Sequence, residues 1–155
     1  MASYGFNLYF SKKVDRQTAL DRILALPGCK PDPDSPDDYW SEWVHLRLGQ
    51  VDQTFIQKNI KQSTGLEVGE FYVAIRVHTA EEEAFLEKWD RTLELLSSGE
   101  DAIAIKEFCA IMFIQRDGQL TLDNSGEDLS PYYRDYILSK RPAQLAPLGL
   151  LAETE

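Results

Sequence analysis

The sequence predicts an α+β fold, in which a single mixed or mainly antiparallel sheet carries helices packed on one face. Segments of alternating apolar and polar residues, typical of strands, recur along the chain, and most of them follow one another directly. A few segments with apolar residues at helical spacing lie between them. The chain has 155 residues, 43% of them apolar, which suffices for one sizeable core but not for two. We therefore expect one domain over residues 1–141 and a loosely ordered C-terminal tail over residues 142–155.

The chain begins with a predicted strand and a predicted helix. Residues 4–10 alternate between apolar and polar side chains, which predicts a half-buried strand. Asp15 is placed as the N-cap of the helix that follows. The apolar stripe of this helix consists of Leu20, Ile23 and Leu24. Pro27 and Gly28 end the helix.

Residues 27–38 are expected to form a long, acidic, Pro-rich surface loop. They include four prolines, which exclude a helix and leave no strand ladder, together with four aspartates. The alternation that follows predicts a strand over residues 40–48, with Trp40 and Val44 on one face and His45 on the other.

The middle of the chain contains one ambiguous segment and two clear elements. Over residues 51–63, apolar residues at helical spacing favour a helix, whereas β-branched residues favour a strand, and both remain open. Residues 70–78 alternate and predict a strand. Thr79 and Glu82 then form a capping box at the start of a helix. The apolar stripe of this helix consists of Phe85, Leu86, Trp89, Leu93 and Leu96.

The last elements are predicted to be three strands and a short helix. The strands occupy residues 102–105, 109–115 and 119–123. Asp117 and Gly118 form the hairpin turn between the second and third of them. A proline at the first helical position, Pro131, opens a helix that runs through Leu138.

The charge of the chain excludes two classes of partner. It has 16 Lys and Arg residues against 26 Asp and Glu residues, for a net charge of −10. Binding a nucleic acid requires clustered cations that release counterions, so we expect no nucleic-acid partner. Anionic membrane surfaces are excluded for the same reason. A basic protein partner, or simple solubility, fits the charge.

The location of the protein is predicted from its cysteines and from its hydropathy. The two cysteines, Cys29 and Cys109, do not form a CxxC motif, which favours a reducing compartment over a disulfide-bonded protein. The N-terminus does not resemble a signal peptide, and no apolar stretch reaches the ~18 residues that a membrane span needs. We expect a cytoplasmic protein that associates with no membrane.

The sequence contains no catalytic or cofactor motif. Phosphate-binding glycine loops, nucleophile elbows and zinc-protease helices are all missing from it. His45 and His78 lie on different predicted strands, and neither has a sequence neighbour that completes a triad. The aspartates of residues 32–38 do not have the glycine and glutamate spacing of a calcium loop. We therefore expect no catalytic residue, no cofactor and no metal.

Acidic residues interleaved with aromatic residues predict a protein-binding face. Tyr and Trp are frequent binding hot spots, and nearby carboxylates steer a basic partner. A first region surrounds residues 34–43, and a second is the predicted helix over residues 81–94. The alternative is an ordinary solvated surface above core aromatics. The candidate contact residues are Asp34, Asp37, Asp38, Tyr39, Glu42, Trp43, Glu83, Glu87 and Asp90.

In its general architecture and charge the chain resembles the immunity proteins that bacteria encode beside interbacterial or polymorphic toxins. The resemblance lies in the opening strand and helix, from Asn7 to Leu26, and in an α+β body ending in the Asp117-Gly118 hairpin. It implies a stoichiometric inhibitor whose acidic, aromatic-bearing face docks over the active site of a basic toxin effector domain. A non-catalytic adaptor or regulatory domain is one alternative. An enzyme with a scattered site around His45 or His78 is the other.

Overall fold

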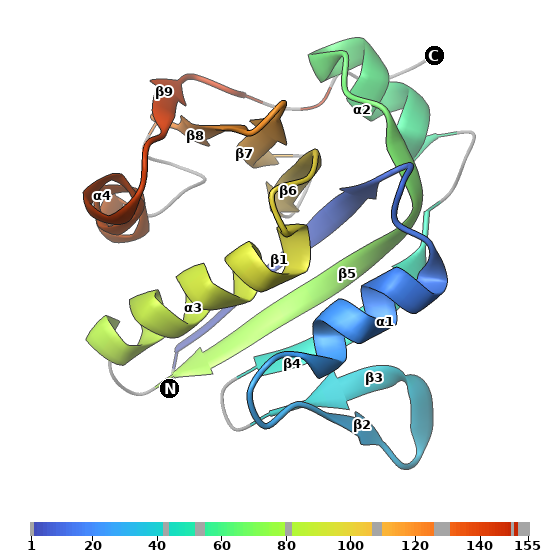
Figure 1. The fold of residues 1–155 in the computed structure, drawn as a ribbon. Coiled ribbons are helices and arrows are strands. Elements are labelled where there is room, and N and C mark those ends of the chain that lie inside the picture. Colours follow the sequence, from blue (N-terminus) through green and yellow to red (C-terminus); the bar gives the residue numbers. More distant parts are fainter. Residues whose placement is uncertain are drawn as a thin grey trace.

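The computed structural model describes residues 2–41, 44–51, 55–79, 82–106, 110–125, 131–149 and 151. Within these ranges the chain forms one sheet and four helices, in a mixed α+β arrangement (Figure 1). The helices are α1 (Arg16–Leu24), α2 (Ile56–Thr64), α3 (Glu82–Ser97) and α4 (Pro131–Lys140). The strands are β1 (Ala2–Ser11), β2 (Lys30–Asp32), β3 (Ser35–Trp40), β4 (Val44–Gln50), β5 (Val68–Thr79), β6 (Ala102–Lys106), β7 (Ala110–Arg116), β8 (Gln119–Asp123) and β9 (Gln144–Ala146).

The sheet has nine strands in the order β2-β3-β4-β5-β1-β6-β7-β8-β9. Neighbouring strands are antiparallel, except for the parallel pair β8–β9. The mixed, mainly antiparallel sheet expected from the sequence is therefore confirmed. The longest pairing joins β1 to β5, so the N-terminal strand lies at the centre of the sheet rather than at its edge.

Two apolar cores lie on opposite faces of the sheet. Along β1, Leu8 belongs to the first core and Tyr9 to the second, because successive side chains of a strand point to opposite faces. As expected, three helices, α1, α3 and α4, contribute to the core on one face. The fourth helix, α2, packs through Ile60 into the second core, together with Leu151 near the C-terminus. Strand β6 is buried on both faces, with Ala104 in the first core and Ile103 in the second. Helices or loops must therefore pack on both faces of the sheet at this strand.

The first two helices, α1 and α2, differ in how clearly the sequence predicts them. The N-cap of α1 is as predicted, since the Asp15 carboxylate accepts a hydrogen bond from the Thr18 backbone N–H at 2.8 Å. That bond lowers the pKa of Asp15. The ambiguous segment over residues 51–63 forms the helix α2 from Ile56 onward, and Gly65 ends it in the left-handed region at φ 77°.

The longest helix, α3, carries the predicted apolar stripe. Trp89, Leu93 and Leu96 are buried in the first core. The side chains of Thr79 and Glu82, for which a capping box is expected, lie outside the described part of the structure, as does that of Phe85.

Residues 27–38 do not form the expected loop. They contribute the edge strand β2 and the beginning of β3, which pair as a hairpin with Lys30 opposite Trp40. The prolines are accommodated because Pro31 lies on the outermost strand, where one side of the backbone has no partner strand, and Pro33 lies in the turn. Proline therefore restricted this segment to a sheet edge rather than excluding it from the sheet.

The predicted continuous strand over residues 40–48 is also wrong. Trp40 ends β3, and Val44 begins β4, with the Ser41 N–H bonded to the Val44 carbonyl at 2.9 Å across the reversal. Trp40 lies opposite His45 in the strand pairing, so the two side chains share one face of the sheet. The buried Val44 side chain is on the other face. Trp40 is in phase with the alternating apolar residues that begin at Val44, so the sequence pattern gives no sign that the chain turns.

The C-terminal segment is docked rather than loosely ordered over residues 142–149 and at Leu151. Strand β9 pairs with β8, and Leu151 is buried in the second core. The Leu148 N–H donates to the buried Asp123 carboxylate at 3.1 Å, and the Gly149 carbonyl accepts from the Ile111 N–H at 2.9 Å. The domain therefore extends beyond residue 141. No helix within the described residues has the length and apolar character to cross a bilayer.

Candidate partner-binding site

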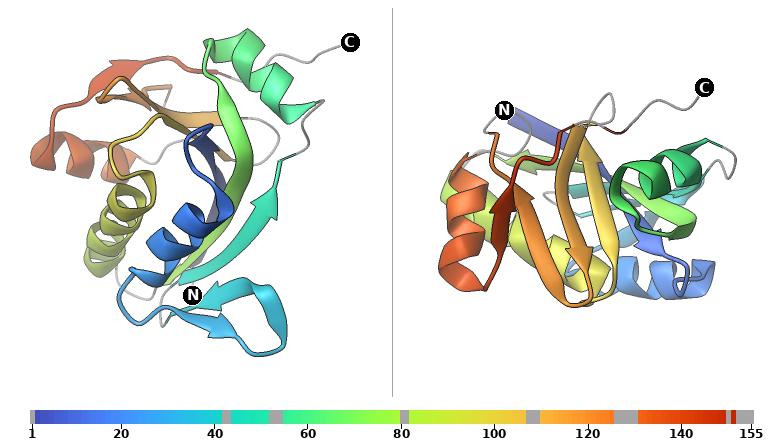
Figure 2. Two further views of the ribbon diagram at one scale, coloured as in Figure 1. Left: turned by 45° about the vertical axis from the view of Figure 1, so that its right-hand side comes forward. Right: turned by 90° about the horizontal axis from the view of Figure 1, so that it is seen from above.

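The β2–β3 hairpin projects from the body of the molecule, beside α1 (Figure 2). Four of the predicted contact residues belong to it: Asp34, Asp37, Asp38 and Tyr39. The hairpin places these four side chains in different environments, so each is considered in turn.

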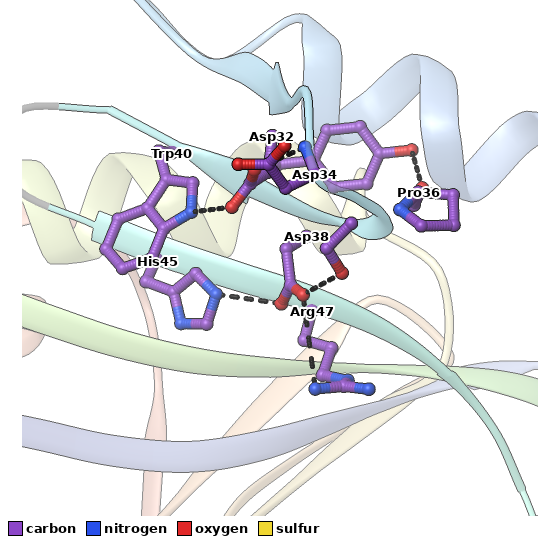
Figure 3. Close-up of polar contacts among 9 residues, drawn as sticks. Asp32, Asp34, Pro36, Asp38, Trp40, His45 and Arg47 are labelled. Carbon is purple, nitrogen blue, oxygen red and sulfur yellow. Dashed lines mark hydrogen bonds and ion pairs between the residues drawn. The ribbon is translucent and has the colours of Figure 1, made fainter.

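Trp40 is the main exposed aromatic side chain of the hairpin, and two contacts hold it in place. Its side chain keeps 46% of its surface exposed. The indole Nε1–H donates to the Asp32 carboxylate at 3.0 Å. The ring stacks on His45, with centroids 4.1 Å apart and planes 24° from parallel (Figure 3). An exposed indole in a fixed orientation loses little side-chain entropy when a partner covers it.

Asp38 lies in the centre of a polar cluster beneath Trp40. It is 8% exposed and accepts a hydrogen bond from the Ser35 hydroxyl. Its Oδ1 is 2.9 Å from His45 Nε2 (Figure 3). The Arg47 guanidinium is 4.0 Å from Oδ2, the oxygen that accepts from Ser35. The Ser35 hydrogen bond, with smaller contributions from His45 and Arg47, holds the pKa of Asp38 below its ordinary value, although burial opposes the shift. This carboxylate stabilises the hairpin against β4 and is not available to a partner, which corrects the prediction.

Substitution of Asp38 by Asn tests this structural role. At pH 7 we expect Asp38→Asn to unfold at a lower urea concentration than the wild type. Because the pKa of Asp38 is lower in the folded chain than its ordinary 3.8, its contribution is present above about pH 4 and is lost as the pH falls further. The difference in the free energy of unfolding between the wild type and Asp38→Asn should therefore become smaller from pH 7 to pH 3. Asp34→Asn is the control and should match the wild type throughout. A difference that stays constant or grows on acidification would contradict the assignment.

Tyr39 also differs from the prediction. It is 5% exposed and belongs to the first core, on the opposite face of β3 from Asp38 and Trp40. Burial raises the pKa of its hydroxyl. Its role is therefore to anchor the hairpin to the body of the protein, and it is not a contact residue.

The remaining acids of the hairpin are accessible. Asp34 is exposed at the turn, where its backbone N–H donates to the Asp32 carboxylate at 2.9 Å. Asp37 is half-buried and pairs with Arg16 at the start of α1, at 3.5 Å. Asp32 is the carboxylate that contacts the indole, whereas Asp37 lies on the opposite face of β3 from Trp40.

Asp32 and Trp40 are not among the contact residues predicted from the sequence. The alternation over residues 40–48 predicts Trp40 on the face of Val44, which is the core face, and the prolines place Asp32 in a surface loop. The Pro33-Asp34-Ser35 segment, with its turn-forming residues, is the signal that could have located the hairpin.

The second predicted region, on α3, is separated from the hairpin. Glu87 is exposed on α3, but Asp90 is 9% exposed and pairs with Arg141, beyond the end of α4. Burial raises the pKa of Asp90 and outweighs the opposing effect of Arg141. Helix α3 packs over β5 and beside α1, whereas the hairpin lies at the edge of the sheet beyond β4, so the two acidic regions are separated (Figure 1). Glu42, Trp43 and the side chain of Glu83 lie outside the described residues.

The histidine of the cluster is not arranged as the base of a catalytic triad. A triad needs a nucleophile hydroxyl bonded to the imidazole. The Ser35 hydroxyl instead donates to Asp38, the same carboxylate that His45 contacts. The described residues include no group of three or more His, Cys, Asp or Glu side chains that could hold a metal ion.

Known proteins give no further guide to this site. No family model matches the chain, and no curated protein or solved structure matches it either. The function of the hairpin therefore has to follow from its own chemistry, which is that of an exposed, fixed indole among carboxylates.

Proposed function

We propose that the chain is a non-catalytic, stoichiometric protein-binding inhibitor of the immunity type, which acts in the cytoplasm and docks its β2–β3 hairpin over the active site of a basic partner. The observation that carries the proposal is Trp40, which is half exposed yet fixed by Asp32 and by stacking on His45. What distinguishes Trp40 from other exposed apolar side chains is that its ring is held in one orientation, so a partner can cover it at little entropic cost.

The chemistry of the hairpin suits a cationic cleft. Trp is among the residues most enriched in binding hot spots, and nearby carboxylates raise the association rate with a basic surface. Asp32 supplies a carboxylate beside Trp40, Asp34 and Asp37 add negative charge elsewhere on the hairpin, and the net charge of −10 adds long-range attraction. A stable interface buries roughly 1,200–2,000 Å² in total, so the adjoining surface of α1 would contribute to it.

The edges of the sheet bear on the adaptor alternative. An adaptor that binds peptides by strand addition needs a long, unobstructed edge. Both edge strands, β2 and β9, are three residues long, and prolines lie in or beside them at Pro31, Pro33, Pro142 and Pro147. Short edges bearing prolines resist strand addition, so this mode of binding is not favoured.

The test compares Trp40→Ala with Leu145→Ala as a control, because Leu145 is a similarly exposed apolar residue (45%) on β9, at the opposite edge of the sheet. The tagged wild type captures its partner from the native host, the partner is eluted by a salt step and identified, and affinities are measured with purified components. We expect Trp40→Ala to lose about 2 kcal/mol, or about 30-fold in affinity, with an almost unchanged melting temperature. Leu145→Ala should bind like the wild type.

The inhibitory role has a separate readout. The captured partner, expressed alone, should arrest growth, and co-expression of the wild type, but not of Trp40→Ala, should restore it. A partner that binds through Trp40 but does not affect growth would indicate an adaptor instead. Equal binding by Trp40→Ala and the wild type would show that the hairpin is not the binding site.

A further inference from the structure

A hollow of about 540 Å³ lies on the face of the sheet that carries α2, where β1, β4 and β5 are not covered by the helix. Gly5 and Ala74 lie in the lining, on adjacent strands, and they leave the sheet surface open because Gly5 has no side chain and Ala74 has only a methyl group. A Cβ atom added at Gly5 would meet nothing closer than 3.6 Å. The volume is in the range of sites that hold small molecules.

The charge of this hollow is opposite to that of the chain. Three basic side chains lie on this face of the sheet, those of His45, Arg47 and Arg76, and Lys106 near the end of β6 also borders the hollow. Although the chain has 26 Asp and Glu residues, none of them is among the described residues that line the hollow. A local excess of cations at a concave surface is the arrangement that concentrates an anionic ligand.

The register of the sheet brings these basic side chains together. His45 on β4 lies directly opposite Arg76 on β5, and Arg47 lies opposite Ala74 two residues further along. Arg76 is exposed and has no ion-pair partner among the described residues, and Arg47, 63% exposed, reaches only the edge of Asp38 at 4.0 Å. Asp38 contacts both His45 and Arg47, which leaves Arg76 as the basic side chain whose charge a bound anion would offset.

The other side of the hollow is apolar. Ile56 comes from α2, Ile105 from β6 and Leu151 from the C-terminal segment, and the ring of Tyr9 lies beside them. These residues belong to the second core or pack against it, so they form a firm wall. The described lining holds no carboxylate, thiol, serine or threonine, which favours binding over chemistry.

We infer that this hollow is a binding site for a small organic anion, whose carboxylate, sulfonate or phosphate group contacts Arg47 and Arg76 and whose apolar body packs against Ile56, Ile105 and Leu151. The site lies on the sheet face, apart from the exposed acids of the hairpin, and it does not depend on the proposed inhibitor function. His45 is shared, since it lines the hollow and supports Trp40.

The test uses anilinonaphthalene sulfonate, an aromatic body with one sulfonate group, titrated into the folded protein by calorimetry and by dye emission. We expect one site per chain. Arg76→Ala should weaken binding at least tenfold, as expected for the loss of a charge-assisted contact. Arg91→Ala, which removes an exposed charge from α3, is the matched control and should bind like the wild type.

Three further arms separate this site from simpler explanations. Ala74→Leu, which fills the hollow but keeps its charges, should also weaken binding. The neutral dye phenylnaphthylamine and inorganic sulfate should each bind much more weakly than the sulfonate dye, because each offers only one half of the ligand. The inference is overturned if the sulfonate dye does not bind, if Arg76→Ala and Ala74→Leu both bind it like the wild type, or if sulfate alone binds equally tightly.

Discussion

Trp89→Ala is expected to lower the free energy of unfolding by about 3–5 kcal/mol, the usual cost of truncating a fully buried aromatic residue. Trp89 is 0% exposed and lies where three elements meet. Its ring packs edge-on against Phe6 of β1, with centroids 5.4 Å apart and planes at 77°, and it contacts the ring of Tyr133 on α4. Removing it leaves a cavity between the sheet, α3 and α4.

Urea denaturation at neutral pH measures this effect, and Trp40→Ala provides the matched control. Both substitutions remove an indole, but Trp40 is 46% exposed, so its loss should cost no more than about 1 kcal/mol. If the two variants were equally stable, Trp89 would not be a core residue and the packing of α3 on the sheet would be wrong.

Asp123→Ala should cost about 2–4 kcal/mol, because it removes the buried carboxylate that accepts hydrogen bonds from Leu148 and Ser125. The Asp123 side chain is 0% exposed. One carboxylate oxygen accepts from the Leu148 N–H at 3.1 Å, and the other accepts from the Ser125 hydroxyl at 2.6 Å. The carboxylate therefore connects the end of β8 to the chain that follows β9. Its removal should loosen residues 144–149 as well as destabilise the whole domain.

Two measurements separate the local effect from the global one. Hydrogen exchange should show faster exchange at the Leu148 amide in Asp123→Ala, and urea denaturation gives the global cost. Asp135→Ala is the control, since the Asp135 side chain is 70% exposed and pairs only with the adjacent Arg134 among the contacts described. It should change stability by less than about 0.5 kcal/mol. Unchanged protection at Leu148 would show that the carboxylate does not hold the C-terminal segment.

The candidate site was only partly predictable. The acidic, aromatic character of residues 34–39 drew attention to the right segment, and Asp34, Asp37 and Glu87 are accessible as expected. Asp38 and Asp90 were misjudged because an aspartate in a sequence gives no sign of a cation that folding will place beside it. Arg141, the partner of Asp90, is 51 residues away along the chain.

The basic hollow could not be predicted from the sequence. Its four basic residues come from three strands and are spread between residues 45 and 106, so no local charge cluster marks them. Composition indicated an acidic protein and argued against nucleic acids and anionic membrane surfaces as partners. That conclusion holds for the average surface, whereas a site depends on which charges the strand register places side by side.

The sequence by itself determined the local elements whose signals lie within one turn or one strand. The Asp15 cap, the apolar stripe of α3 and the alternation of β5 depend on neighbouring residues alone, and they identified the α+β class. Only the tertiary structure decided that α2 is a helix on the second face, that residues 30–40 form an edge hairpin and that the C-terminal segment docks on β8. Each of these depends on a partner distant in the chain, because a strand or an amphipathic helix acquires its position from the surface it buries.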